Sequence, residues 1–201
     1  AGGNVYAFVV VSPFAAARDG SAQAVEGLLQ LMPDGDEIAF AEVAPPHAPA
    51  GIVAREAVCL QMTASTFTRA ARDVGARALG EADAADMLAL ALLTRPGPFR
   101  TRTHMLGRFL GVREGGQLVA MAGERLSVPG YREISAVCTH PAWQGRGLGG
   151  ALLQQVGERI QREGETPFLH TYAHNAPAVA LYGKLGFTVR TQIVHAVWTR
   201  G

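Results

Sequence analysis

A glycine-rich run stands between a strand-like segment and a helix-like segment, and its backbone has the composition of an anion-binding loop. The run extends from Gln144 to Gly150 and has glycine at four of its seven positions. It follows the apolar segment 134–139 and precedes residues 151–156, whose apolar side chains have helical spacing. Such a loop leaves backbone N–H groups unpaired at the positive end of a helix dipole. We expect the loop to bind a phosphate or a pyrophosphate.

One pattern that fits the run is the dinucleotide-binding fingerprint G-x-G-x-x-G, which Gly145, Gly147 and Gly150 satisfy. In a dinucleotide-binding fold the glycines follow their strand directly, whereas Pro141 intervenes here. Only about 50 residues follow the run, too few for the further parallel units of that fold. The fingerprint alone is therefore a weak indication of a nicotinamide site.

A second pattern, Q/R-x-x-G-x-G/A, is satisfied by Gln144, Gly147 and Gly149. It resembles the acetyl-CoA pyrophosphate loop of the GCN5-related N-acetyltransferase (GNAT) superfamily. The preceding residues 139–141, Thr-His-Pro, are similar to the V-x-P with which that superfamily ends the strand before the loop, with Thr in place of Val. A glycine-rich turn that only caps an ordinary helix remains a third interpretation.

A separate segment near the C-terminus distinguishes between these interpretations. Residues 175–187 read N-x-x-A-x-x-L-Y-x-x-L-G-F and resemble the C-terminal segment of the same superfamily. A dinucleotide-binding fold gives no reason for this second match. The chain is therefore identified as a member of the GNAT superfamily, closest to the FR47-like acetyltransferases, and the resemblance covers about residues 73 to 201.

The resemblance implies that two central strands, ending near Thr139 and Tyr172, separate and admit acetyl-CoA as the cosubstrate. Backbone groups of the first strand would pair with the pantetheine arm and the acetyl carbonyl, and the glycine run would hold the pyrophosphate. Asn175 would bind the pantetheine or cap the following helix. The implied cofactor-binding residues are Val137, Cys138, Thr139, Gln144, Gly145, Arg146, Gly147, Leu148, Gly149, Gly150, Asn175 and Tyr182, and no metal is implied.

Tyr182 is the expected general acid, since the motif places it beside the departing thiolate. A phenol with a pKa of about 10 can protonate a thiolate whose conjugate acid has a pKa of about 8.5. A packed helix tyrosine is the alternative interpretation.

Two residues are candidates for the base that receives the proton of the amine. Glu133 matches a position where several superfamily members carry a base glutamate, and the two-residue period puts it on one face with Ser135, Val137 and Thr139. His170 occupies a position where members that act on protein N-termini carry glutamate, so its role departs from the pattern. A water chain, or no dedicated base, is the third possibility.

The composition describes a chain that can bury a core. The 201 residues are 48% hydrophobic and 17% charged, with a formal net charge of +1 and no cluster of Lys and Arg. Nucleic acid is therefore not expected as a partner. Cys59 and Cys138 are too few and too far apart for a disulfide framework or a metal site. No apolar run is long enough to span a membrane, so a cytoplasmic location is expected.

The order of predicted elements places the motifs on a mixed sheet. Residues 73–201 read as β-α-β-β-β-α-β-α-β, with strands at 131–139 and 168–172 and helices at 148–162 and 175–185. This order is typical of an α/β or α+β fold with helices packed on a mixed sheet. Residues 1–72 read as an N-terminal αβ extension that covers the site, completes the sheet or mediates a dimer.

The sequence thus predicts an N-acetyltransferase that transfers the acetyl group of acetyl-CoA to a primary amine by direct attack in a ternary complex. The resemblance implies that residues 84–99 and 189–198 line the acceptor pocket, and these segments are mostly apolar and carry no acidic cluster. The acceptor would therefore be a small amine, an amino acid or a peptide N-terminus. The alternative is a non-catalytic acyl-CoA-binding or interaction module on the same fold. A homodimer is compatible with either function.

Overall fold

The computed structural model describes residues 5–7, 11–32, 35–66 and 73–201. Short 3-10 helices cover Glu81–Asp83, Thr103–Leu106 and Pro141–Trp143. The helices are α1 (Ala22–Leu31), α2 (Ala84–Thr94), α3 (Leu148–Arg162) and α4 (Ala176–Lys184). The strands are β1 (Val5–Ala7), β2 (Ala15–Ala17), β3 (Glu37–Glu42), β4 (Ile52–Thr63), β5 (Arg77–Leu79), β6 (Phe109–Glu114), β7 (Gln117–Val128), β8 (Tyr131–Thr139), β9 (Thr166–Tyr172) and β10 (Thr188–Arg200).

The fold class predicted from the sequence is confirmed. One sheet has the strand order β3-β10-β4-β9-β8-β7-β6-β5, and β8 with β9 is its parallel pair among antiparallel neighbours. From residue 73 onward the elements follow in the predicted order. A parallel pair needs a crossover connection, and α3 provides it between β8 and β9.

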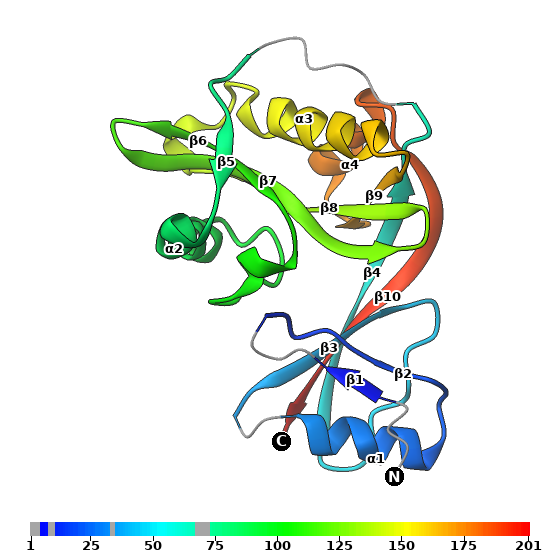
Figure 1. Cartoon of the computed structure of the whole chain (residues 1–201). Helices are drawn as coiled ribbons and strands as arrows, with labels where there is room; N and C mark the ends of the chain where they lie inside the picture. The colour runs from blue at the N-terminus through cyan, green and yellow to red at the C-terminus, as the bar shows by residue number, and fades with distance from the viewer. Residues whose placement is uncertain (1–4, 8–10, 33–34, 67–72) are drawn as a thin grey trace.

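The predicted N-terminal extension contributes strands to this same sheet. β3 forms one edge, and β4 lies between β9 and the C-terminal strand β10. β4 and β10 pair along almost their whole lengths, from Ile52↔Arg200 to Thr63↔Thr188. In Figure 1 these two long strands run from the upper part of the molecule, with α3 and α4, to the lower part, with α1 and β1–β3. A segment of the N-terminal extension and the C-terminal strand therefore pair in one sheet, with a single register irregularity between Val189 and Thr191.

Helices cover both faces of the sheet around its centre (Figure 1). α3 packs on one face through Leu152, Leu153, Val156 and Ile160, which share a core with β6–β9, and α4 lies beside it. α2 packs on the opposite face, where Met87 and Leu90 contact apolar side chains of β6–β8. The lower part has its own core, in which Phe40 and Trp198 meet edge to face at 4.8 Å. These layers fix the positions of β8, β9 and the two helix starts that frame the site.

Candidate active site

The two central strands separate partway along their length. β8 and β9 pair in parallel from Tyr131↔Thr166 to Glu133↔Phe168, and no pair beyond Glu133 joins the described residues of the two strands. A cavity of about 640 Å³ opens where they separate, and residues 133–139 of β8 and 169–172 of β9 line it. The backbone edge of β8 that faces β9 is therefore open to a ligand in this region.

The glycine run lies at one end of this cavity and leads directly into α3. Gly145 and Gly147 have φ values of +75° and +73°, which L side chains rarely adopt, and Gly147 is the N-cap of the helix without a side-chain cap. Helix geometry leaves the N–H groups of Leu148, Gly149 and Gly150 without carbonyl partners in the helix itself. The loop therefore presents donors at the positive end of α3.

The start of α3 packs closely against β8. A Cβ on Gly149 would lie 3.3 Å from Oγ1 of Thr139 and 3.7 Å from Cγ1 of Val137, so glycine permits this approach. The guanidinium of Arg146 lies 4.2 Å from the centre of the Trp143 ring. This cation–π contact holds the arginine on the loop that precedes the helix.

Most of the residues predicted to bind the cofactor line one cavity. Arg146, Gly147, Leu148 and Gly150 belong to the same loop and helix start but are not among its described lining residues. The lining includes Val137, Cys138, Thr139, Gln144, Gly145, Gly149, Asn175 and Tyr182. The end of β8 at Thr139 and the start of α4 at Asn175, separated by 36 residues or roughly 120 Å if fully extended, are thus brought together.

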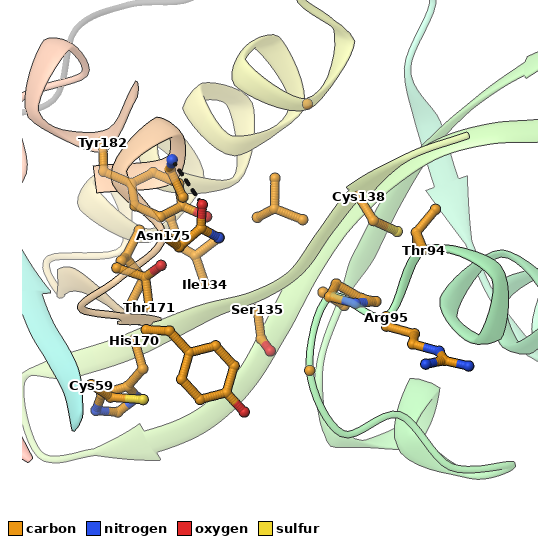
Figure 2. A pocket seen from close by; sticks show the side chains of 18 of the residues that line it. Cys59, Thr94, Arg95, Ile134, Ser135, Cys138, His170, Thr171, Asn175 and Tyr182 are labelled. Carbon is orange, nitrogen blue, oxygen red and sulfur yellow. Dashed lines mark hydrogen bonds between the residues drawn. The ribbon is translucent and has the colours of Figure 1, made fainter. Parts of the chain in front are cut away.

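Asn175 and Tyr182 approach the cavity from α4. The Oδ1 atom of Asn175 accepts a hydrogen bond of 3.3 Å from the Ala178 N–H and caps the helix, drawn as the dashed line in Figure 2. The ring of Tyr182 meets Phe187 edge to face, with centroids 6.2 Å apart. Burial raises the pKa of the Tyr182 phenol above its ordinary value, so the hydroxyl keeps its proton at neutral pH.

A β-bulge in β8 corrects one sequence-based expectation. Ser135 pairs with Gly123 and Cys138 with Met121, so residues 136 and 137 both oppose Ala122, and Ala136 has a φ of +53°. The two-residue period is therefore interrupted. Val137 and Thr139 face α3, as their distances to Gly149 show, whereas Glu133 and Ser135 lie on the opposite face.

The side chains around the bulge confirm this change of face. Ile134 belongs to the core beneath α3, while Ala136 and Cys138 belong to the core beneath α2. In Figure 2 Ile134 lies toward Asn175, and Cys138 lies beside Thr94 on the other side of the strand. The prediction that Glu133 shares a face with Val137 and Thr139 was wrong, because an alanine in the left-handed region has no sequence signal.

Glu133 is buried and forms an ion pair on the face opposite α3. Its Oε2 accepts from Nε of Arg125 at 2.8 Å, its Oε1 accepts from Nη2 at 2.5 Å, and Oε1 also lies 2.8 Å from Nδ1 of His170. Burial alone would raise the pKa of the Glu133 carboxyl, but the Arg125 charge and the hydrogen bonds from both partners outweigh it and lower the pKa to about 2. Glu133 is therefore an ionised carboxylate with little tendency to take up a proton.

Both ring nitrogens of His170 are engaged. The side-chain amide of Gln61 lies 3.1 Å from Nε2 of His170, and Nη1 of Arg190 donates to Oε1 of Gln61 at 2.5 Å. Arg190 thus fixes the amide oxygen, so the amide nitrogen of Gln61 must donate to Nε2. The network assigns the imidazole hydrogen to Nδ1, where it donates to Glu133.

Sequence reasoning expected residues 189–198 to line the acceptor pocket but singled out none of the aromatic and histidine side chains at the other end of the cavity. The ring of Phe14 lies 4.7 Å beneath the guanidinium carbon of Arg125 and meets the ring of His195 edge to face at 5.8 Å. The hydroxyl of Tyr172 is 3.4 Å from Nδ1 of His195. The two-residue period of β9 puts Tyr172 on the same face as His170, so the sequence could have indicated that Tyr172 lies near the site. Phe14 and His195 reach the site only through long-range pairing, which the sequence does not reveal.

Neither a metal-binding cluster nor a membrane-crossing helix is present among the described residues. Among them, no group of three or more His, Cys, Asp or Glu side chains is arranged to hold a metal ion. Within the same residues, no helix combines the length and apolar character needed to cross a bilayer.

Comparisons with known proteins agree with this geometry. Residues 109–198 match the family model of FR47-like proteins. The whole chain superimposes on the crystal structure of a GNAT-family protein from Novosphingobium aromaticivorans, with a TM-score of 0.91, 41% sequence identity, and coverage of 100% of this chain and 90% of that chain. The chain belongs to the GNAT superfamily, and it carries the FR47-like region of that superfamily.

Curated relatives match a shorter part of the chain. N-alpha-acetyltransferase RimI of Mycobacterium tuberculosis is 37% identical over 82 residues, which are 39% of this chain and 51% of that protein. Mycothiol acetyltransferase of Corynebacterium aurimucosum is 36% identical over 73 residues, which are 36% of this chain and 23% of that protein. The matched parts thus span about half of the first relative and about a quarter of the second.

Proposed function

We propose that this chain is an N-acetyltransferase that transfers the acetyl group of acetyl-CoA to a primary amine by direct attack in a ternary complex. The observation that carries the proposal is the separation of β8 from β9 after Glu133 and Phe168, directly beside the N-terminus of α3, which has no side-chain cap. An extended arm can pair with the free edge of β8 while its anionic end binds the loop. The names of the matched relatives, which are acetyltransferases, support the same chemistry.

The described residues fit acetyl-CoA at the glycine loop and along the adjoining part of β8. The N–H groups that follow Gly147 suit a pyrophosphate, and the absence of a side chain on Gly149 leaves room beside Val137 and Thr139. The backbone of β8 from Val137 to Thr139 is placed to pair with the pantetheine amides. The bulge at Ala136 takes backbone groups out of the ladder with β7, so one N–H is available to polarise the thioester carbonyl.

Two groups of this chain have assigned roles in the transfer: a backbone N–H at the bulge and the phenol of Tyr182. The neutral amine attacks the thioester carbonyl carbon, and the backbone N–H at the bulge stabilises the negative charge that develops on oxygen. The carbon–sulfur bond breaks, and Tyr182 gives its phenolic proton to the departing thiolate. Burial, which keeps the Tyr182 hydroxyl protonated, supports this role.

Glu133 and His170 were the two predicted bases, and their contacts support a positioning role. The charge of Arg125 keeps Glu133 ionised, and the ring nitrogens of His170 are occupied by Glu133 and Gln61. A group whose lone pair already accepts a hydrogen bond must break that bond before it takes a proton. Glu133 and His170 instead form a hydrogen-bonded wall of the cavity, in which Arg125 neutralises the charge of Glu133.

The acceptor in this proposal is a small amine, an amino acid or a peptide N-terminus. Arg125, His170, His195 and the aromatic rings of Phe14 and Tyr172 line the acceptor end, and the carboxylate there, Glu133, is already paired. A polycationic amine would find no free negative charge among these residues. An amine that carries an apolar, aromatic or carboxylate group suits the lining better.

Turnover tests the proposal directly. Free thiol released from acetyl-CoA is followed with a panel of aliphatic amines, aromatic amines, amino acids and peptides with free N-termini, and acetyl-CoA binding is titrated by calorimetry. We expect binding together with amine-dependent release of thiol. Binding without release by any amine would instead favour the non-catalytic acyl-CoA-binding module, and no heat at millimolar acetyl-CoA would reject both functions.

A further inference from the structure

The acceptor end of the cavity contains a histidine and a tyrosine that reach toward each other across an intervening strand. Tyr172 ends β9, and His195 lies on β10, with β4 between them. Their side chains meet at 3.4 Å between the phenol oxygen and Nδ1, and the two rings contact edge to face at 5.9 Å. Both residues line the cavity.

The register of the sheet explains how this contact spans a strand. Cys59 of β4 pairs with Tyr172 on one side, and Ala57 of β4 pairs with His195 on the other. Cys59 and Ala57 are two residues apart, so all four side chains lie on one face. The two positions on β4 carry small side chains, and the larger rings of Tyr172 and His195 close over them.

We infer that His195 is the catalytic base of the acetyl transfer, taking the proton of the acceptor amine on Nε2 while Tyr172 positions the ring through Nδ1. The inference rests on the proposed function and assigns the proton acceptor that the proposal leaves open. In the required tautomer, Nδ1–H donates to the phenol oxygen of Tyr172 and Nε2 presents its lone pair. Among the described residues, Nε2 of His195 has no hydrogen-bond partner, in contrast to Nε2 of His170.

The groups that face His195 keep it in the form that accepts a proton. Burial lowers the pKa of His195 below its ordinary value, and the charge of Arg125 from β7 lowers it further. His170 from β9 adds to this effect only when its ring is protonated. Two other facing groups are uncharged at neutral pH: burial raises the pKa of the Tyr172 phenol, and it raises that of the Cys59 thiol to about 11.

The edge strand β3 supplies one further charge near this pair. Glu37 acts electrostatically on Tyr172, and it is itself paired with Arg55 at 3.5 Å. His195 is therefore neutral at pH 7 and ready to act as a base.

The proton and electron balance of the step is complete. The ammonium form of the acceptor gives one proton to Nε2 of His195, and the freed nitrogen lone pair forms the bond to the acetyl carbon. The carbon–sulfur bond breaks, the thiolate takes the proton of Tyr182, and the second amine proton leaves to water and restores Tyr182 through solvent. Histidinium at 195 then loses its proton to solvent, so one proton is released for each acetyl group transferred.

The pH profile of His195→Asn tests the assignment, because asparagine keeps an N–H near the position of Nδ1 but has no base. The probe is the fastest amine of the panel whose conjugate acid has a pKa above about 9. In the native protein, His195 can deprotonate the bound ammonium, so kcat/KM should be level from the pKa of His195 up to that of the amine. In His195→Asn only free amine reacts, so log kcat/KM should rise with unit slope through neutral pH.

The same variant should lose activity by about 100-fold or more at pH 7 and keep its affinity for acetyl-CoA. Tyr172→Phe should lower the plateau of kcat/KM and retain its level shape, as a positioning role requires. The matched control is His174→Gln, an exposed histidine that stacks on Tyr172 at 5.3 Å but does not line the cavity. The control should keep both rate and profile.

Failure of the inference is distinguishable from failure of the proposed function. If the native protein acetylates the amine and His195→Asn keeps a level profile at the native rate, His195 is not the base. If no amine is acetylated, the proposed function fails. The histidine signals, assigned with His195→Asn and followed by nuclear magnetic resonance with CoA bound, give a readout independent of turnover. A His195 imidazole that is protonated at pH 7 would overturn the inference, and a neutral one would support it.

Discussion

The Glu133 carboxylate and the Arg125 guanidinium form a buried two-point ion pair, in which Nε donates to Oε2 at 2.8 Å and Nη2 donates to Oε1 at 2.5 Å. The side chains of Glu133 and Arg125 are only 1% and 8% exposed. Removing one charge from such a pair leaves the other buried without compensation. Loss of either charge should therefore destabilise the fold at the wall of the cavity.

Glu133→Gln should destabilise the fold by about 3–5 kcal/mol, because Arg125 keeps its charge in a buried position. The free energy of unfolding in urea measures the loss. Adding Arg125→Gln to the same chain should recover part of it, since the double variant buries no unpaired charge. A double variant whose loss equals the sum of the two single losses would show that the two side chains act independently.

Acid should weaken the native protein through this same carboxyl. The pKa of Glu133 falls from an ordinary value of 4.5 to about 2 on folding, so the unfolded chain binds the proton more readily than the folded chain. The stabilisation is therefore fully present above pH 4.5 and is lost as the pH falls from there toward 2. The linkage relation gives Glu133 a contribution of about 3 kcal/mol to the free energy of unfolding.

Urea unfolding at pH 5 and at pH 3 measures this contribution. Glu133→Gln should show a shallower fall in stability between the two pH values than the native protein. Glu114→Gln, an exposed glutamate at the end of β6, is the control and should follow the native curve. Equal slopes in the native protein and in Glu133→Gln would mean that the pKa of Glu133 does not change on folding.

The elements that surround the proposed acetyl-CoA site were largely predictable from the sequence, because local sequence patterns specify each of them. Strand 131–139 and helix 148–162 were predicted with the bounds that the structure gives them. Alternating apolar residues, a glycine run and a proline mark each boundary within a few residues. The same local signals located the start of α4, where Asn175 caps the helix.

The acceptor side depended on information that the sequence does not carry locally. The insertion of β4 between β9 and β10 brings Cys59 beside Tyr172, and no pattern in either segment specifies that pairing. The bulge at Ala136 reverses which face Val137 occupies, although alanine rarely adopts a positive φ. Long-range register and a single irregular residue thus decided which side chains meet in the cavity.

Tyr182→Phe tests the expected general acid. The variant keeps the ring that packs on Phe187 and loses only the hydroxyl, so the fold and acetyl-CoA affinity should be retained. We expect kcat to fall by about 100-fold, since the thiolate must then leave without a positioned proton donor. Tyr131→Phe, at the exposed start of β8, is the matched control and should keep the native kcat. An unchanged kcat in Tyr182→Phe would exclude the phenol from the mechanism.

The glycine loop can be tested with two substitutions that impose the same backbone strain in different places. Gly145 in the loop and Gly130 in the turn between β7 and β8 have φ values of +75° and +79°, and a Cβ on either would meet no atom within 4 Å. Gly145→Ala and Gly130→Ala should therefore each lose about 1–2 kcal/mol of stability. Only Gly145 lines the cavity, so only its substitution should disturb the N–H groups that face the ligand.

We expect Gly145→Ala to weaken acetyl-CoA binding by about tenfold or more, the effect of losing one hydrogen bond to a charged group. Calorimetric titration of both variants measures the difference, and urea unfolding verifies that their stabilities match. Desulfo-CoA, which keeps the pyrophosphate, should lose affinity to the same extent, while pantetheine, which lacks it, should bind both variants equally. Equal acetyl-CoA affinities in the two variants would place the pyrophosphate outside this loop.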